Sequence, residues 1–159
     1  MARLLGDTLP PEFVSAFDGT NLEAKLGLIC LGVSVDPDGC PRAFMLSAGE
    51  VLVVGPRAVR LALWPKSRTA DNLGAGGAVL LGFMAPRTVL YAKGTVRRLG
   101  MAAAGADVEC FEIEVNRVES DLHEGFPLVQ GPRYACEDAD PAEVVRGWQK
   151  TLTALRRFP

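Results

Sequence analysis

The sequence predicts a mainly β, α+β fold: an antiparallel, closed or partly split β-barrel of about six strands, with a short N-terminal helix, a short mid-chain helix and a C-terminal helix. Apolar runs of strand length follow one another through short turns rich in glycine and proline, without the intervening helices that a parallel sheet requires. Closure would remove the exposed edges that so many apolar strands otherwise present. The 159 residues fit a single domain, 1–159, long enough to bury a core without disulfides or metals.

The first third of the chain predicts a helix followed by a hairpin. A helix is expected over residues 8–17, because two prolines open it and its apolar side chains share one face, which would cover one end of a sheet. The apolar run 26–35 predicts a buried strand. The Asp-Pro-Asp-Gly sequence at 36–39 is typical of a tight turn, so residues 41–48 should form the returning strand.

Further strands and helices follow from the same signals. Short strands are expected at 51–54 and 59–64, longer ones at 78–83, 88–99 and 108–118, with a turn or loose linker at 100–105. Residues 119–137 are polar and contain prolines, so they predict an irregular surface segment. Asp140 and Pro141 provide the N-cap and first position of a final helix, and apolar residues at helical spacing indicate that it packs on the sheet.

Composition argues against several function classes. With 17 basic and 19 acidic residues and a pI near 5.5, the chain lacks the positive charge that nucleic-acid binding requires. Its N-terminus turns polar too early for a secretory signal and no apolar run reaches spanning length, so we expect a soluble cytoplasmic protein with no membrane partner. The four widely spaced cysteines favour buried free thiols over disulfides or a metal site, and His123 has no second ligand nearby.

The stretch 61–73 is the strongest candidate for a binding site, because an apolar strand stops at a proline and a short polar helix begins. Ser67 is a good N-cap, and Arg68 and Thr69 fall in the first turn, where free backbone N–H groups carry partial positive charge. A guanidinium and two hydroxyls at this place would suit a phosphate. The alternative is that Ser67 only caps the helix while Lys66 and Arg68 face water.

Read together, Arg42 on the strand after the 36–39 turn and the Ser67-Arg68-Thr69 triplet resemble the FMN-binding split-barrel family, which includes proteins similar to pyridoxamine 5'-phosphate oxidase. In that family an arginine on the second strand and a Ser-Arg-Lys triplet opening a short helix hold the phosphate and ribityl chain of FMN. The resemblance extends from about residue 26 to 118 and includes Gly94 in a later strand.

Two departures qualify the resemblance. Thr69 stands where the family has lysine, which removes one positive charge beside the phosphate, and Lys66 is the residue placed to replace it. The C-terminus also lacks the Arg-x-His motif of the true oxidase, which argues against pyridoxamine phosphate oxidase activity.

The resemblance implies an FMN-dependent oxidoreductase with a small-molecule substrate, a homodimer with the cofactor site at its interface, and some site residues from the second subunit. The flavin supplies the redox chemistry, and no catalytic side chain is assigned. The alternatives are a non-catalytic module holding flavin, haem or deazaflavin, and a dimeric barrel that lacks FMN. Trp64 either stacks near the flavin or packs in the core. The expected cofactor-binding residues are Ser67, Arg68 and Thr69 at the phosphate, Arg42 and Lys66 as added charge, and the backbone of Phe44, Met45 and Leu46 with Ser47 along the ring.

Overall fold

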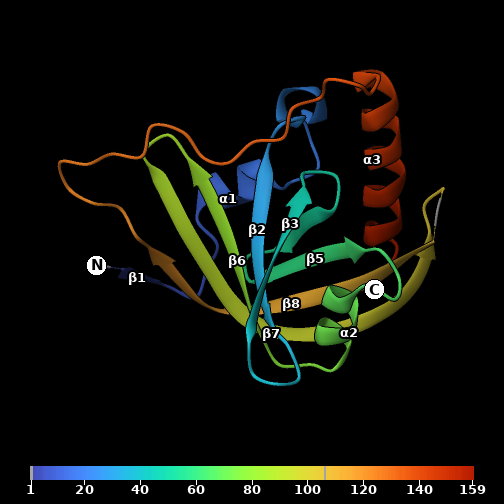
Figure 1. Cartoon of the computed structure of the whole chain (residues 1–159), viewed down its shortest axis with the longest axis horizontal. Helices are drawn as coiled ribbons and strands as arrows, with labels where there is room; N and C mark the ends of the chain where they lie inside the picture. Colours follow the sequence, from blue (N-terminus) through green and yellow to red (C-terminus); the bar gives the residue numbers. More distant parts are fainter. Residues whose placement is uncertain (1, 106) are drawn as a thin grey trace.

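The structure, a computed structural model, describes residues 2–105 and 107–159, and this part of the chain forms one strongly curled antiparallel sheet of eight strands (Figure 1). The strands are β1 (Arg3–Gly6), β2 (Ile29–Val35), β3 (Pro41–Ser47), β4 (Val51–Gly55), β5 (Ala58–Leu63), β6 (Ala78–Ala85), β7 (Thr88–Ala103) and β8 (Asp107–Ser120). The helices are α1 (Pro11–Ala16), α2 (Arg68–Gly74) and α3 (Pro141–Arg156), with a 3-10 turn, η1 (Leu22–Lys25).

The sheet is a barrel that stays open between two of its strands. Its order is β3-β2-β6-β7-β8-β5-β4, with β1 added beside the end of β8. β3 and β4 follow each other in the chain but occupy opposite edges. The expected antiparallel split barrel is therefore confirmed. Its longest strands are β7 and β8, which are 16 and 14 residues in length.

The sequence underestimated the strands in two places. β1 was not expected, and it pairs with the last residues of β8, so residues 119 and 120 belong to a strand and not to the irregular segment. The predicted turn at 100–105 is also wrong in part, because β7 continues to Ala103. Gly100 has a φ of 130° and lies at a register shift between β7 and β8, so it forms a bulge within the ladder where a turn was expected.

The barrel interior is filled by aromatic and aliphatic side chains. Phe13 and Phe17 of the α1 region meet Phe83 of β6, with ring centroids 5.1 to 6.3 Å apart. All three rings are buried. From the other end, Ala70 and Leu73 of α2 join the same core, so both short helices help to close the barrel.

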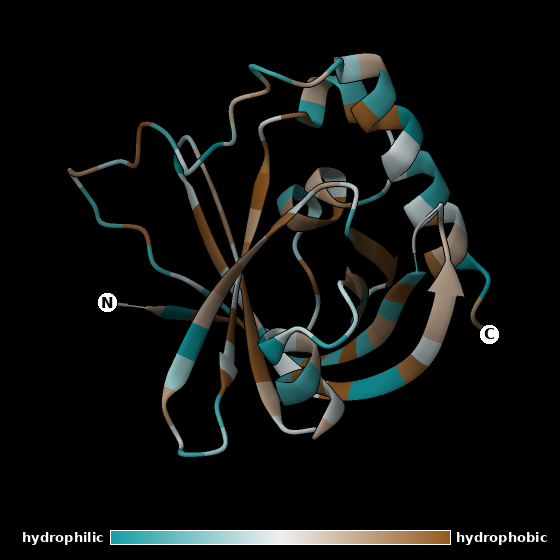
Figure 2. Cartoon of the chain, turned by 45° about the vertical axis from the view of Figure 1, so that its right-hand side comes forward, coloured by the Kyte–Doolittle hydropathy of each residue, from teal (hydrophilic) through white to brown (hydrophobic). Residues whose placement is uncertain are grey.

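A second core lies outside the barrel, between α3 and the strands β4, β5 and β8. Val145, Leu152 and Leu155 of α3 pack there against Leu52 and Cys110, which confirms the apolar face predicted for the last helix. In Figure 2 the helix carries both hydrophobic and hydrophilic residues, as expected for an amphipathic helix. The segment between β8 and α3 runs along one edge of the molecule in Figure 1.

The cysteines divide into two classes. All four are free thiols, but only Cys30 and Cys110 are buried, whereas Cys40 and Cys136 are exposed, so the expectation of buried thiols is right for two of them. Within the described residues, no helix has the length and apolar character needed to cross a membrane.

Candidate functional site

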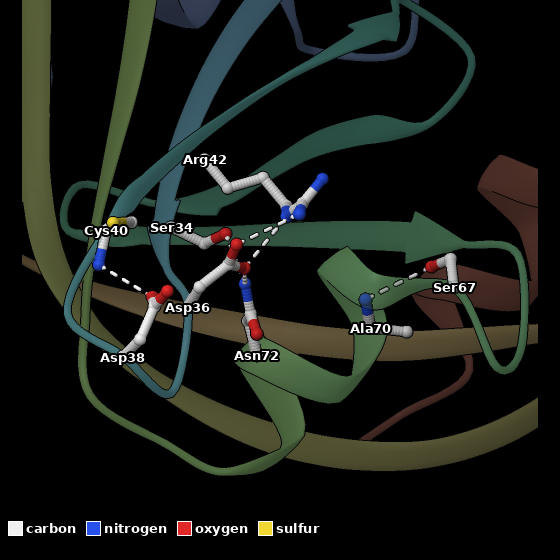
Figure 3. Close-up of polar contacts among 8 residues, drawn as sticks. All are labelled: Ser34, Asp36, Asp38, Cys40, Arg42, Ser67, Ala70 and Asn72. Carbon is white, nitrogen blue, oxygen red and sulfur yellow. Dashed lines mark hydrogen bonds and ion pairs between the residues drawn. The ribbon is translucent and has the colours of Figure 1, made fainter.

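Arg42 and helix α2 meet at one end of the barrel through a shared carboxylate (Figure 3). The Arg42 guanidinium donates through Nε and Nη2 to the two oxygens of Asp36, at 2.8 and 2.9 Å. Asn72 of α2 donates from Nδ2 to Asp36 Oδ1 at 2.7 Å and to the hydroxyl of Ser34 at 3.1 Å. These contacts place Arg42 beside the short helix predicted to bind phosphate.

The β2–β3 hairpin explains why these residues meet. The Asp36 N–H donates to the carbonyl of Cys40, and the Gly39 N–H donates to the carbonyl of Asp36, each at 2.8 Å. Gly39 has a φ of 86°, a conformation that glycine adopts without strain. The resulting register pairs Ser34 with Arg42 and fixes the arginine opposite the end of β2.

The electrostatics centre on Asp36. Hydrogen bonds from Arg42 and Asn72, together with the positive charge of Arg68, hold the pKa of the Asp36 carboxyl at about 2. Arg68 therefore lies close enough to act on the same carboxylate that Arg42 binds. Of the two arginines predicted to hold an anion, Arg42 is paired with Asp36, whereas Arg68 acts on that carboxylate only through its charge.

The helix start at Ser67 forms as predicted. The Ser67 hydroxyl accepts the N–H of Ala70 at 3.1 Å, and Arg68 is exposed in the first turn. Thr69 is half-buried. Lys66 is exposed and takes a φ of 60°, which turns the chain from β5 into α2.

Two other predicted residues lie at a different place. Ser47 and Trp64 both line a cavity of about 320 Å³ between the ends of β3 and β5 and helix α3. The Ser47 hydroxyl and its backbone N–H both donate to one Glu50 oxygen at 2.7 Å. Trp64 is 65% exposed, so the core-packing alternative for this residue is wrong. Trp148 of α3 also lines this cavity.

The predicted ring-lining segment of β3 has two different faces. Phe44 and Leu46 point to the barrel interior, and the Phe44 ring covers Gly32 of β2. Met45 points outward and is 53% exposed. In the described sheet β3 pairs only with β2, so its other side has backbone N–H and C=O groups available to a ligand.

The structure thus joins Arg42 to α2 and Ser47 to Trp64, at opposite ends of β3. Sequence reasoning missed Asp36, Asn72 and Ser34. Asp36 was assigned only a role in the turn, although a turn that begins with Asp and is followed by Arg on the returning strand is a local signal for such a pair. Asn72 had the weaker signal of a polar residue next to the buried side of a short helix.

Comparison with known proteins agrees with the fold. No protein-family model matches the chain. An uncharacterised protein of Bacillus subtilis, YclD, is 28% identical over 141 residues, which cover 88% of this chain and 90% of YclD. A candidate pyridoxamine 5'-phosphate oxidase from Lactobacillus delbrueckii has 19% identity and a TM-score of 0.59, and it covers 74% of this chain and 98% of its own. The chain shares the split-barrel fold of the solved structure.

A second solved structure extends the comparison to another member of this fold group. An F420 reductase is 16% identical with a TM-score of 0.54, and the match covers 69% of this chain and 98% of the reductase. At these identities the likeness concerns the fold, which both solved structures share with this chain.

Proposed function

We propose that this protein binds FMN and acts as an FMN-dependent oxidoreductase on a small-molecule substrate. The observation that carries the proposal is the paired hydrogen bond that holds Arg42 on Asp36 beside α2, with the charge of Arg68 near the same carboxylate, in a barrel of the fold described above. The names of the candidate oxidase and of the F420 reductase add support from the same fold group.

The residues available suit an elongated anionic ligand. Arg68 is exposed, and the third nitrogen of the Arg42 guanidinium has no bond to Asp36, so both can reach a phosphate. The open backbone side of β3 leads from Arg42 toward Ser47, where Trp64 offers an exposed aromatic face. Bound FMN would supply the hydride or electron transfer itself, and the protein would position it and admit the substrate.

The absorption spectrum of freshly purified protein and an FMN titration test the proposal. We expect either a flavin spectrum or saturable FMN binding, and we expect Arg68→Ala to weaken that binding by about tenfold or more, because a charge-assisted phosphate contact is lost. Arg146→Ala, which removes an exposed arginine from α3, is the matched control. A colourless protein that does not bind FMN would overturn the proposal.

Turnover requires a separate measurement. Anaerobic mixing of the flavin-loaded protein with NADH or NADPH should bleach the flavin absorbance if a nicotinamide is the electron donor. A flavin that stays oxidised with every donor tested would favour a non-catalytic cofactor-binding module.

We further propose that the protein is a homodimer whose second subunit completes the site. The outer face of β2 and β3 carries adjacent apolar side chains, because the register pairs Leu31 with Met45 and places Val33 and Val35 on the same side. Val35 and Met45 are 49% and 53% exposed. This face lies directly behind the strand edge proposed to contact the flavin, so a second copy covering it would also approach the cofactor.

A further inference from the structure

Asp36 competes with any anion for the Arg42 guanidinium. Two of the three guanidinium nitrogens already donate to the two carboxylate oxygens, and the third points away from Asp36 in Figure 3. A phosphate that approaches Arg42 therefore meets one free nitrogen instead of the paired donors of a bidentate contact. To gain the paired contact, it must displace the carboxylate.

The competitor is firmly held. Asp36 also accepts a 2.7 Å hydrogen bond from Asn72, and its side chain is only 18% exposed. Asn72 is anchored in turn to Ser34, which is buried. The Asp36 carboxylate therefore stays where the phosphate is proposed to bind. It opposes a phosphate by charge repulsion and by occupying the Arg42 guanidinium.

We propose that Asp36 sets the anion affinity of this site by weakening the binding of phosphate monoesters. For the flavin ligand, which rests on the proposed function, Asp36 would reduce the preference for FMN over riboflavin, because riboflavin lacks the phosphate. Asp36 is in this sense a specificity-determining residue that acts through Arg42. FMN bound while Arg42 stays paired with Asp36 would exchange with free flavin more readily than FMN bound by an arginine that has no carboxylate partner.

The test compares Asp36→Asn with a matched control on the same turn. Asp38→Asn removes an equal charge, but the Asp38 carboxylate accepts the backbone N–H of Cys40 at 3.0 Å. It acts on Arg42 only as a nearby charge, whereas Asp36 occupies two of the guanidinium nitrogens. Inorganic phosphate, FMN and riboflavin are titrated into the wild type and each variant, and binding is followed by calorimetry. We expect D36N to bind phosphate and FMN about fivefold to tenfold more tightly, with riboflavin unchanged and D38N close to the wild type.

A double variant assigns the gain to Arg42. In D36N combined with Arg42→Ala the improvement should disappear, because the freed guanidinium is absent. Equal phosphate affinity in D36N and the wild type, an equal gain in D38N, or a gain that persists without Arg42 would each overturn the inference. If D36N fails to fold in a thermal melt, Asp36→Ser removes the same charge with a residue that also suits the first position of a turn.

The titrations with phosphate and with flavin test the role of Asp36 and the proposed FMN-dependent function separately. Tighter phosphate binding by D36N together with no FMN binding by any variant would leave the role of Asp36 intact and overturn the proposed function. FMN binding that is insensitive to D36N would support the proposed function and overturn the role of Asp36.

Discussion

Gly94 is a residue at which β7 and β8 approach too closely for a side chain. A Cβ at this position would lie 2.1 Å from the carbonyl oxygen of Glu114, on the neighbouring backbone. The ladder shifts register beside Gly94, so the close approach belongs to a bulge. Backbone atoms cannot rotate away as a side chain can, and the contact therefore requires glycine.

We expect Gly94→Ala to lower the free energy of unfolding by about 2 kcal/mol or more, through steric overlap with β8. Gly74→Ala is the control, because Gly74 ends α2 with open space around it and alanine favours a helix by up to about 1 kcal/mol. Urea denaturation of both variants measures the difference. Equal stability of G94A and the wild type would contradict the assigned contact.

Asp36 should also give the protein an acid-sensitive contribution to stability. Its pKa is lowered from 3.8 to about 2 by Arg42 and Asn72, so folding favours the ionised carboxylate. That contribution is fully present above about pH 4 and is lost as pH falls toward 2.

The melting temperature of D36N should therefore lie below that of the wild type at pH 7, and the gap should narrow between about pH 4 and pH 2. Thermal melts followed by circular dichroism across this range provide the measurement. A gap that stays constant down to pH 2 would show that the carboxylate is not stabilised by its partners.

At the scale of elements, a buried arginine holds the C-terminal end of α3 on the sheet, in addition to the packing of the helix's apolar face. Arg60 of β5 donates from Nη1 to the carbonyls of Leu155 and Phe158, each at 2.9 Å, and from Nη2 to that of Pro159 at 3.1 Å. Its Nε binds Glu112 at 2.8 Å. The arginine thus satisfies the Leu155 carbonyl in the last turn of the helix and two carbonyls of the residues that follow it, and it adds the charge preferred there.

Replacing Arg60 with alanine should lower the free energy of unfolding by about 3 kcal/mol and loosen residues 141–159, because one buried and two part-buried carbonyls lose their donor and Glu112 loses its ion pair. Arg97→Ala is the control, since Arg97 binds the same carboxylate of Glu112 but is 66% exposed, and it should cost less than about 1 kcal/mol. Urea denaturation and limited proteolysis would detect both effects. Similar losses in the two variants would contradict the role of Arg60.

The elements that were predictable from the sequence are those with local signals. Ser67 and Asp140 mark the starts of α2 and α3, and both caps form. β1 has no such signal, because its four exposed residues become a strand only through pairing with β8. The same holds for the proposed phosphate-binding residues. Arg42 and Arg68 could be predicted from their local sequence, whereas the contact between Asp36 and Asn72 joins residues 36 positions apart and could not.

At the scale of the whole molecule, the apolar outer face of β2 and β3 predicts self-association. We expect the wild type to sediment as a dimer and Met45→Asp to shift it toward monomer, because a charge would be buried in the interface. Val54→Asp is the control, since Val54 is 39% exposed on β4, at the opposite edge of the sheet. A monomeric wild type would contradict the proposed dimer.

The interior of this barrel is filled by phenylalanine side chains, so the residues that stabilise the fold differ from those that a ligand could contact. With Phe13, Phe17 and Phe83 in contact at its centre, the barrel holds a solid core instead of a binding chamber. A ligand of this barrel would therefore bind at the rim or on the outer surface, beside exposed side chains such as those of Trp64 and Arg68. Exchanging exposed residues around β3 and α2 should therefore change what binds at the surface without repacking the barrel.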